Sequence, residues 1–272
     1  MPIFKDDPVP KFSANLSFLY QDLPFLDRFT AAAEDGFGAL EYLGPYAEPK
    51  EKVAEALEAS GLKQALFNVP SGDWAGGERG IACLPERVEE FRNGIAQALD
   101  YAAALDCRQV NVISGLVPKG ADLQTLENVL VDNLKYAAKR CADVGVKLLV
   151  EPINLRDIPG FFLSTTADAE RILDRVGSNN LYIQYDFYHM QIMQGDLVPT
   201  FIRLKEKIAH VQIADNPGRG EPGTGEINYS FILSELDRLG YDGWVGCEYK
   251  PTSGTSEGLG WMKPYLMSAR AA

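Results

Sequence analysis

The chain has 272 residues, which fits one large domain or two small ones, and an eight-stranded α/β barrel typically needs roughly 250 residues. Its net charge of -12, from 38 acidic and 26 basic residues, disfavours a nucleic-acid partner, because no basic cluster offsets the repulsion of a phosphate backbone. The longest apolar runs are strand-sized, and the N-terminal MPIFKDDPVPK has acidic residues and prolines where a secretory signal would be apolar. We therefore expect no membrane partner.

The four cysteines are scattered along the chain without a C-x-x-C pair: Cys83, Cys107, Cys141 and Cys247. An oxidised scaffold of this size would be denser in cysteine. This pattern predicts reduced, structural thiols in a cytoplasmic protein.

Strand-like apolar runs alternate with longer helical patterns in about eight units. In chain order, we predict strand and helix pairs at 12–16 and 23–35, 39–43 and 49–60, 64–68 and 85–105, 109–113 and 123–144, 147–150 and 166–176, 181–185 and 197–205, 208–213 and 230–239, and 244–247 and 259–268. Gly36 and Gly61 stand where helix C-caps belong, and Pro85 suits a first helical position. Ser164 or Thr165 can cap the fifth long helix.

The pattern predicts a (β/α)8 barrel. The fourth, fifth and eighth strands (VNVI, KLLV, WVGC) are nearly all apolar, as expected when both faces of a parallel strand are covered. A doubly wound open sheet is the alternative, but it would be expected to show a Gly-rich turn after an early strand, whereas the Gly-rich loops here follow the third and seventh. We expect a single α/β domain over residues 1–272, with residues 1–10 as a flexible N-terminal extension.

Four consecutive predicted strands end in oxygen-bearing side chains: Glu151, Asp186, Gln212 and Glu248. In such barrels the chemistry lies at the carboxyl ends of the strands. Three carboxylates around one mouth would repel one another unless protons or a cation intervened. A divalent metal bound by these four residues resolves the conflict, and oxygen ligands favour Mg²⁺ or Mn²⁺ over zinc. The alternative is that they are ordinary solvated residues at strand ends.

The two histidines of the sequence both lie within these motifs. His189 follows Asp186 by three residues, and a D-x-x-H turn points both side chains to one side. We therefore predict that His189 contacts substrate, with a structural hydrogen bond as the alternative. His210 faces the same way as Gln212 but one layer deeper, so support of the site and contact with ligand both remain open.

A substrate carboxylate in so acidic a protein needs a local cation. Arg219, in the Gly-rich loop after the seventh strand, and Lys250, two residues beyond Glu248, are the candidates, and a surface role is the alternative for Lys250. The long loop after the third strand contains Trp74 and Arg79, which we expect to cover the mouth and bind substrate, unless the loop is a structural Ω-loop.

Seven longer motifs carry a resemblance to a known family: FSANLS at 12–17, GDWAGGERGIAC at 72–83, EPIN at 151–154, DIPGF at 157–161, IQYDFYHMQ at 183–191, HVQIADNPGRGEPGTGEINY at 210–229 and GWVGCEYKP at 243–251. They resemble the hydroxypyruvate isomerase family of xylose isomerase-like barrels, which also include 2-oxotetronate isomerases and ketose 3-epimerases.

The resemblance implies a role for each matching residue: proton donor and acceptor for Glu151 and Glu248, the rest of the metal shell for Asp186 and Gln212, and substrate contact for His189 and Arg219. The implied activity interconverts 3-hydroxypyruvate and 2-hydroxy-3-oxopropanoate through a cis-enediolate. Ketose 3-epimerases usually have histidine where Gln212 stands, which favours the hydroxypyruvate and oxotetronate branch.

The alternatives are a 2-oxotetronate isomerase or ketose 3-epimerase, a metal-dependent nuclease of the same barrel superfamily, and a non-catalytic binding protein. A nuclease would be expected to have more histidine ligands and a basic groove. A binding site for an anion gains nothing from two extra carboxylates. The expected partner is a small anionic hydroxy-oxo acid, and a homo-oligomer is left open.

Overall fold

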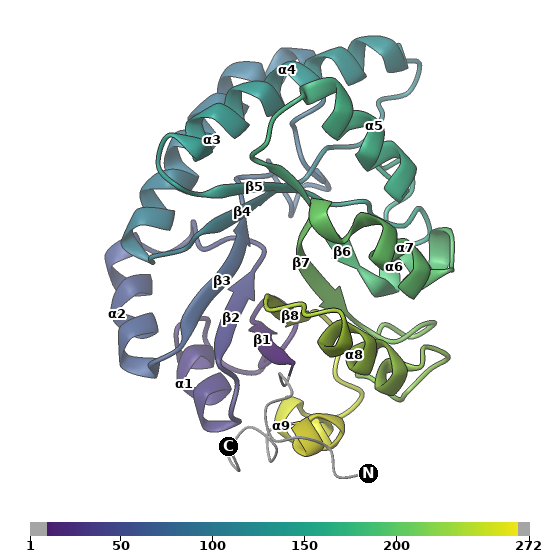
Figure 1. Cartoon of the computed structure of the whole chain (residues 1–272). Coiled ribbons are helices and arrows are strands. Elements are labelled where there is room, and N and C mark those ends of the chain that lie inside the picture. The colour runs from purple at the N-terminus through teal and green to yellow at the C-terminus, as the bar shows by residue number, and fades with distance from the viewer. Residues whose placement is uncertain (1–9, 266–272) are drawn as a thin grey trace.

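The computed structural model describes residues 10–265, and eight parallel strands close into a barrel in sequence order, with β8 paired to β1 (Figure 1). The strands are β1 (Lys11–Asn15), β2 (Ala39–Tyr42), β3 (Lys63–Asn68), β4 (Gln109–Val112), β5 (Lys147–Val150), β6 (Leu181–Asp186), β7 (Ile208–Ile213) and β8 (Trp244–Cys247). The predicted barrel is confirmed.

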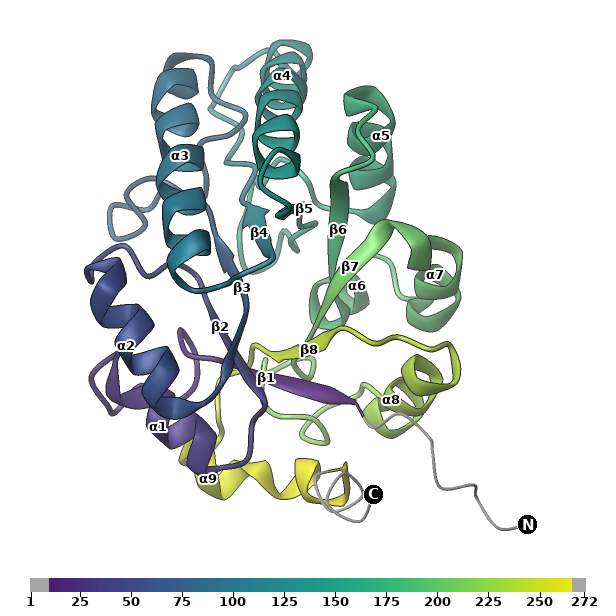
Figure 2. The same ribbon diagram turned by 60° about the vertical axis from the view of Figure 1, so that its left-hand side comes forward.

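Helices surround the barrel (Figures 1 and 2). They are α1 (Asp27–Glu34), α2 (Lys50–Ser60), α3 (Val88–Ala104), α4 (Leu123–Ala142), α5 (Thr166–Val176), α6 (Phe187–Met193), α7 (Leu197–Leu204), α8 (Tyr229–Arg238) and α9 (Thr255–Gly258). Short 3-10 turns lie at Pro85–Arg87, Lys205–Lys207 and Leu259–Met262. Among residues 10–265, no helix is both long and apolar enough to cross a bilayer.

The local chemistry of the helix ends explains most boundaries. Gly61 ends α2 in the left-handed conformation (φ 67°). At α5 the cap is Thr165, whose hydroxyl accepts from the Asp168 N–H while the Asp168 carboxylate accepts from the Thr165 N–H. The predicted start of the first helix at residue 23 is wrong by four residues, because Pro24 disfavours helical geometry at Leu23 and a turn fills 24–27.

Three other predicted segments end earlier than predicted or lie partly outside the described residues. The fourth helix stops at Ala142, two residues early, where Gly145 (φ 71°) turns the chain into β5. Of the predicted closing helix, 259–262 form a 3-10 turn and residues 266–268 lie outside the described part. Of the predicted N-terminal extension, residues 1–9 also lie outside it.

The interior of this barrel contains polar side chains. The strand register places Asn15 level with Glu41, and Gln212 level with both Asp186 and Gly246. The side chains of these strands that point inward bring amides and acids together at the carboxyl ends, while apolar side chains pack under the helices. The register therefore gathers polar groups from distant parts of the sequence at one rim.

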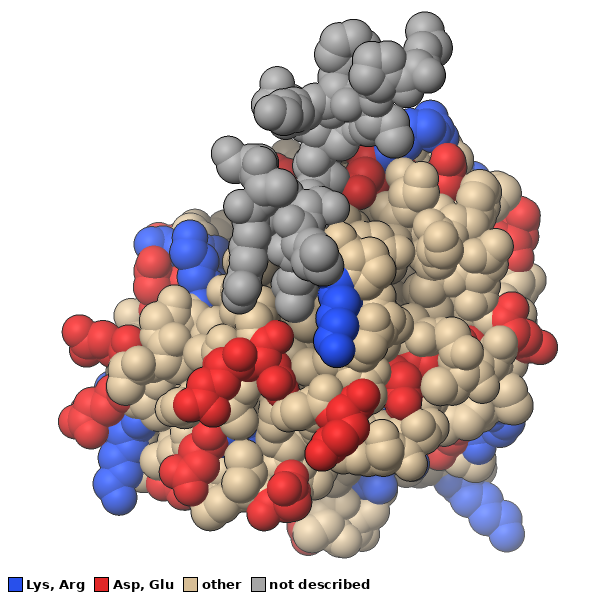
Figure 3. Space-filling model, turned by 90° about the horizontal axis from the view of Figure 1, so that it is seen from below, with Lys and Arg blue, Asp and Glu red and all other residues tan. Residues whose placement is uncertain are grey.

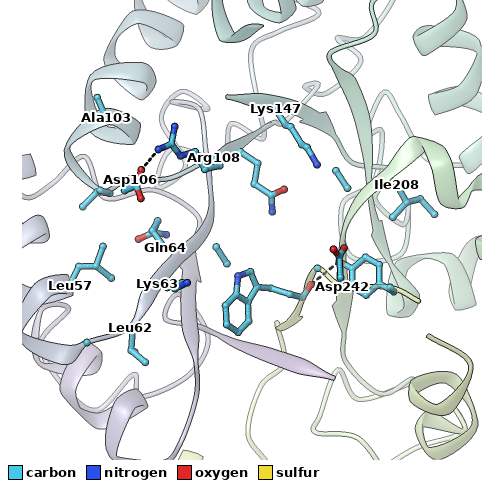
Figure 4. A pocket seen from close by; sticks show the side chains of 18 of the residues that line it. Leu57, Leu62, Lys63, Gln64, Ala103, Asp106, Arg108, Lys147, Ile208 and Asp242 are labelled. Atoms are coloured by element: carbon cyan, nitrogen blue, oxygen red, sulfur yellow. Dashed lines mark hydrogen bonds and ion pairs between the residues drawn. The ribbon is translucent and has the colours of Figure 1, made fainter. Parts of the chain in front are cut away.

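The other rim holds a cavity of about 990 Å³ (Figure 4). Its lining includes the first residues of five strands, Lys63, Gln109, Lys147, Ile208 and Trp244. None of the four predicted strand-end site residues lines it. The candidate chemistry therefore lies at the opposite end of the barrel from this cavity.

Candidate active site

Asp186 places His189 by capping a helix that the sequence analysis missed. The Asp186 carboxylate accepts hydrogen bonds from the backbone N–H of Tyr188 (2.7 Å) and His189 (3.4 Å), which starts α6 immediately after β6. His189 Nε2 then lies 3.5 Å from Asp186 Oδ2 and 3.7 Å from Glu151 Oε1. The predicted turn that points both side chains to one side is in fact the first turn of this helix.

Glu151, Asp186 and His189 form a cluster whose side chains could hold a metal ion. One ligand atom from each lies within 4.8 Å of the others, and all three side chains are buried. Glu151 Oε1 and Asp186 Oδ2 have no hydrogen-bond partner among residues 10–265. Two buried carboxyl oxygens without hydrogen-bond partners and an imidazole nitrogen are a donor set that a divalent cation can use.

The electrostatics of the cluster favour protons or a cation. Burial, and then the charges of Glu248 and Asp186, raise the pKa of Glu151 well above its ordinary value. Burial raises the pKa of Asp186 to about 6, against the opposing charge of Arg219. Burial and the Arg219 charge lower the pKa of His189 well below its usual value, so the imidazole is neutral at pH 7.

Glu248 is held from both sides. Its Oε1 accepts from Arg219 Nη2 (2.5 Å), and its Oε2 accepts from Asn15 Nδ2 (2.8 Å) and Gln212 Nε2 (2.7 Å). The Gln212 oxygen accepts from Gln184 Nε2 (2.6 Å). Of the four predicted metal ligands, Glu151 and Asp186 therefore lie in the cluster with His189. Gln212 and Glu248 are hydrogen-bonded to other side chains beside it.

Burial raises the pKa of Glu248 to about 8, with further contributions from Asp186 and Glu41 that the Arg219 charge opposes. A carboxyl group with such a pKa can take up and release a proton near neutral pH. This property is what acid/base catalysis requires of a carboxyl side chain.

Arg219 extends into the site between two aromatic rings. Its guanidinium carbon lies 4.7 Å from the Phe18 ring centre and 5.1 Å from that of Tyr188, and Nη1 lies 3.6 Å from Asp157 Oδ2. Arg219 Nε has no hydrogen-bond partner in the described part of the chain. The arginine predicted from the loop sequence thus meets Glu248 in the mouth.

A buried carboxylate shapes the loop that carries Arg219. Asp215 accepts backbone N–H groups from Gly223 (2.9 Å), Gly225 (2.9 Å) and Ile227 (3.0 Å). A Cβ at Gly225 would lie 2.1 Å from the Asn216 carbonyl oxygen, so only glycine fits there.

The other predicted substrate-binding residues lie outside this cluster. Lys250 is exposed, and its backbone N–H donates to the Arg219 carbonyl (2.7 Å). Arg79 stacks on Trp74 at 4.2 Å and donates to the Trp74 carbonyl (3.0 Å). Within residues 10–265, no hydrogen bond or ion pair links these three side chains to the strand-end acids.

Sequence reasoning missed the polar residues inside the first four strands. Glu41 is fully buried in β2, and Asn111 Nδ2 in β4 donates to Glu151 Oε2 (3.2 Å). His189 Nδ1 meets Asn154 Nδ2 at 2.6 Å. The signal was available for Glu41, because a charged residue between Leu40 and Tyr42 interrupts an apolar strand.

His210 supports the site from below. Its Nε2 lies 2.9 Å from Glu41 Oε2, and its Nδ1 lies 3.3 Å from Gln109 Nε2. Burial tends to raise the pKa of Glu41, but His210, Ser13 and Gln212 together hold it below its ordinary value. Of the two roles left open for His210, the geometry favours support.

The raised pKa of Glu248 predicts how stability depends on pH. Because its pKa is about 8 in the fold and near 4.5 in an unfolded chain, the folded state binds more protons between these values, and the free energy of unfolding must fall as pH rises. His189 acts oppositely, but below pH 6.5. With chelator present, urea denaturation should therefore show that the free energy of unfolding falls between pH 6.5 and pH 8. The expected fall is up to about 2 kcal/mol for each carboxyl group whose pKa is raised to about 8. The free energy of unfolding of Glu248→Gln should fall less over the same pH range. A rise in the free energy of unfolding of the wild type would contradict the raised pKa of Glu248.

The chain matches proteins of one family over nearly its whole length. Residues 29–265 match the family described as xylose isomerase-like TIM barrel. It is 49% identical over 258 residues to the 2-oxo-tetronate isomerase of Cupriavidus necator, covering 95% of this chain and 99% of that protein. It is 50% identical over 255 residues to the hydroxypyruvate isomerase of Escherichia coli (strain K12), covering 94% of this chain and 99% of that protein.

A solved structure shows the same agreement in three dimensions. The crystal structure described as AP endonuclease, family 2, from Brucella melitensis superposes with a TM-score of 0.92 at 45% identity, covering 94% of this chain and 99% of that one. The family match over residues 29–265 and the closed barrel agree, and this protein belongs to the xylose isomerase-like TIM barrel family.

Proposed function

We propose that this protein is an isomerase that interconverts 3-hydroxypyruvate and 2-hydroxy-3-oxopropanoate (tartronate semialdehyde), with 2-oxo-tetronate as the alternative substrate. The observation that carries the proposal is the pair of buried carboxyls, Glu151 and Glu248, which share one mouth with Arg219 and have raised pKa values. The names of relatives at about half identity support the same activity.

Moving a carbonyl group between adjacent carbons requires one proton to be removed from the first carbon and another to be added to the second. One carboxylate removes a proton from C3 of hydroxypyruvate, and the electrons of that C–H bond form the double bond of a cis-enediolate between C2 and C3. The other carboxyl group returns a proton to C2, while the hydroxyl proton passes from O3 to O2. Glu151 and Glu248 are the residues we assign to these transfers.

Arg219 is the residue we assign to the substrate carboxylate. Its guanidinium is rigid, remains charged and lies against Phe18 and Tyr188, so its donors are oriented before substrate binds. The carboxylate would replace Glu248 or Asp157 as one of its partners. Lys250, Trp74 and Arg79 stay predictions for contacts farther out on the rim.

We propose that a divalent cation, Mg²⁺ or Mn²⁺, binds at Glu151 and Asp186, beside His189. When bound, such an ion stabilises negative charge that develops on the substrate oxygens. Gln212 and Glu248 remain in the proposed ligand set. To join it, the Gln212 oxygen must leave Gln184, and Glu248 must leave Arg219.

A substrate panel followed by NMR tests the proposal. We expect turnover of hydroxypyruvate or 2-oxo-tetronate in D₂O, with deuterium entering the product, and slower turnover of ketoses. Chelator should suppress the activity and Mn²⁺ should restore it, with one Mn²⁺ bound per chain in wild type and none in Asp186→Asn. Binding of hydroxypyruvate without exchange or turnover would identify a binding protein instead.

The competing readings have less support. On the face shown in Figure 3, acidic and basic side chains are interspersed without a continuous basic patch. The net charge of -12 for the whole chain does not favour a nuclease. A ketose 3-epimerase would leave Arg219 without an anionic partner in the substrate. A cytoplasmic location stays a prediction, supported by four cysteines that are all free and buried.

A further inference from the structure

Glu41 is a charged group inside the barrel that the proposed chemistry does not use. Its side chain is 0% exposed, and it lies in β2, three strands away from β7 around the barrel. A buried carboxylate without partners costs several kcal/mol. Its retention inside the barrel therefore calls for a compensating set of contacts.

The interior is built around this carboxylate. Glu41 Oε2 accepts from Ser13 Oγ (2.6 Å) and faces His210 Nε2 (2.9 Å). A Cβ at Gly246 in β8 would lie 2.4 Å and 2.5 Å from the two Glu41 oxygens. Strand β8 thus omits a side chain where the carboxylate needs room, and β1 and β7 supply its donors.

The other Glu41 oxygen connects directly to the amides that hold Glu248. Asn15 Nδ2 donates to Glu41 Oε1 (3.2 Å) and to Glu248 Oε2 (2.8 Å). Gln212 Nε2 donates to the same two oxygens, at 2.7 Å each. Each NH₂ group has two hydrogens, so each amide bridges the two carboxylates.

This bridging fixes which end of each amide faces Glu248. The far end of each amide is held as well, because Asn15 Oδ1 accepts from the Ser17 N–H (3.0 Å) and Gln212 Oε1 accepts from Gln184 Nε2 (2.6 Å). Without Glu41, each NH₂ group would lose one of its two acceptors and would be held less firmly toward Glu248 Oε2. With Glu41 in place, the NH₂ ends are directed inward, and Gln184 holds the opposite end of Gln212. Glu248 Oε2 is thereby held by the two amides, while Oε1 accepts from Arg219 Nη2.

We propose that Glu41, anchored by Ser13 and His210, is a positioning residue for the isomerisation, which orients Glu248 through the amides of Asn15 and Gln212. This inference rests on the acid/base role proposed above for Glu248. Glu41 does not touch substrate, so its loss should slow proton transfer more than it weakens substrate binding.

The test compares Glu41→Met, which removes both acceptor oxygens, with Glu41→Gln, which keeps one. With saturating Mn²⁺, we expect kcat to fall about 10- to 100-fold in Glu41→Met and less in Glu41→Gln, with KM within about threefold of wild type. Glu127→Met, at a partly buried ion pair on α4, is the matched control and should retain wild-type kcat.

A second readout separates positioning from loss of folded enzyme. In D₂O, the ratio of deuterium in recovered substrate to product formed reports how the two proton transfers are balanced. Impaired positioning of Glu248 should change this ratio at least about threefold, whereas fewer folded molecules would lower both quantities equally. An unchanged ratio, or kcat equal to wild type in Glu41→Met, would overturn the proposal.

Two further variants keep the test decisive. If Glu41→Met does not fold, Ser13→Ala removes a single anchor, and a smaller change of the same ratio is expected. An unchanged ratio in Ser13→Ala would then overturn the inference. Glu248→Gln is measured in parallel: if it keeps full activity, the proposed role of Glu248 fails, whereas a dead Glu248→Gln with a normal Glu41→Met refutes only the role of Glu41.

Discussion

Glu151→Gln and Glu248→Gln should each lower kcat by about 10²- to 10⁴-fold while leaving the barrel folded. Glutamine has the shape of glutamate and its carbonyl oxygen can still accept a hydrogen bond, from Asn111 at position 151 or from Asn15 at position 248. The amide cannot carry the transferred proton. Because two transfers at adjacent carbons are needed, loss of either carboxyl blocks net isomerisation.

Steady-state turnover of hydroxypyruvate measures this effect, with circular dichroism and thermal unfolding to check the fold. Deuterium exchange into unreacted substrate distinguishes the two residues, because the variant that keeps the first proton transfer still exchanges. Near wild-type kcat in both variants would refute their acid/base roles. Glu127→Gln, the same substitution on the outer surface of the barrel, is the control.

The fold could be predicted because its signal is periodic. Each barrel strand carries apolar residues at consecutive or alternate positions and is followed by a helical pattern, and predicted and observed strand bounds agree within about one residue. The helix α6 was missed because Phe187–Met193 directly continues an apolar strand, with no turn residues between them. Its start depends on the Asp186 carboxylate bonding two backbone N–H groups, which a pattern of apolar residues does not reveal.

Site residues at the ends of strands could be predicted from the sequence. Site residues whose contacts reach across the barrel could not. Asp186 and Glu151 approach each other because adjacent parallel strands end at one rim. Glu41 meets His210 across the interior, 169 positions apart in sequence, and no local pattern encodes that contact. The direction of the Gln212 amide likewise follows from acceptors on other strands.

Substitution of Arg219 should strongly reduce the preference of the enzyme for hydroxypyruvate over an uncharged substrate. Dihydroxyacetone has the same reacting carbons as hydroxypyruvate but a hydroxymethyl group in place of the carboxylate. Because a buried, oriented guanidinium binds a carboxylate strongly, Arg219→Met should lower kcat/KM for hydroxypyruvate by about 30- to 1000-fold, the equivalent of 2 to 4 kcal/mol. Dihydroxyacetone turnover, which we expect to be slow in wild type, should change far less.

Comparing the two substrates separates the two partners of Arg219. The arginine also pairs with Glu248, and damage to that carboxyl would slow both substrates equally. Loss of the carboxylate contact slows only hydroxypyruvate, so the ratio of the two kcat/KM values isolates it. Arg219→Lys keeps the charge without the paired donors and should recover part of the preference. Lys250→Met measures the other candidate cation: if it reduces the preference more than Arg219→Met, the substrate carboxylate binds at Lys250.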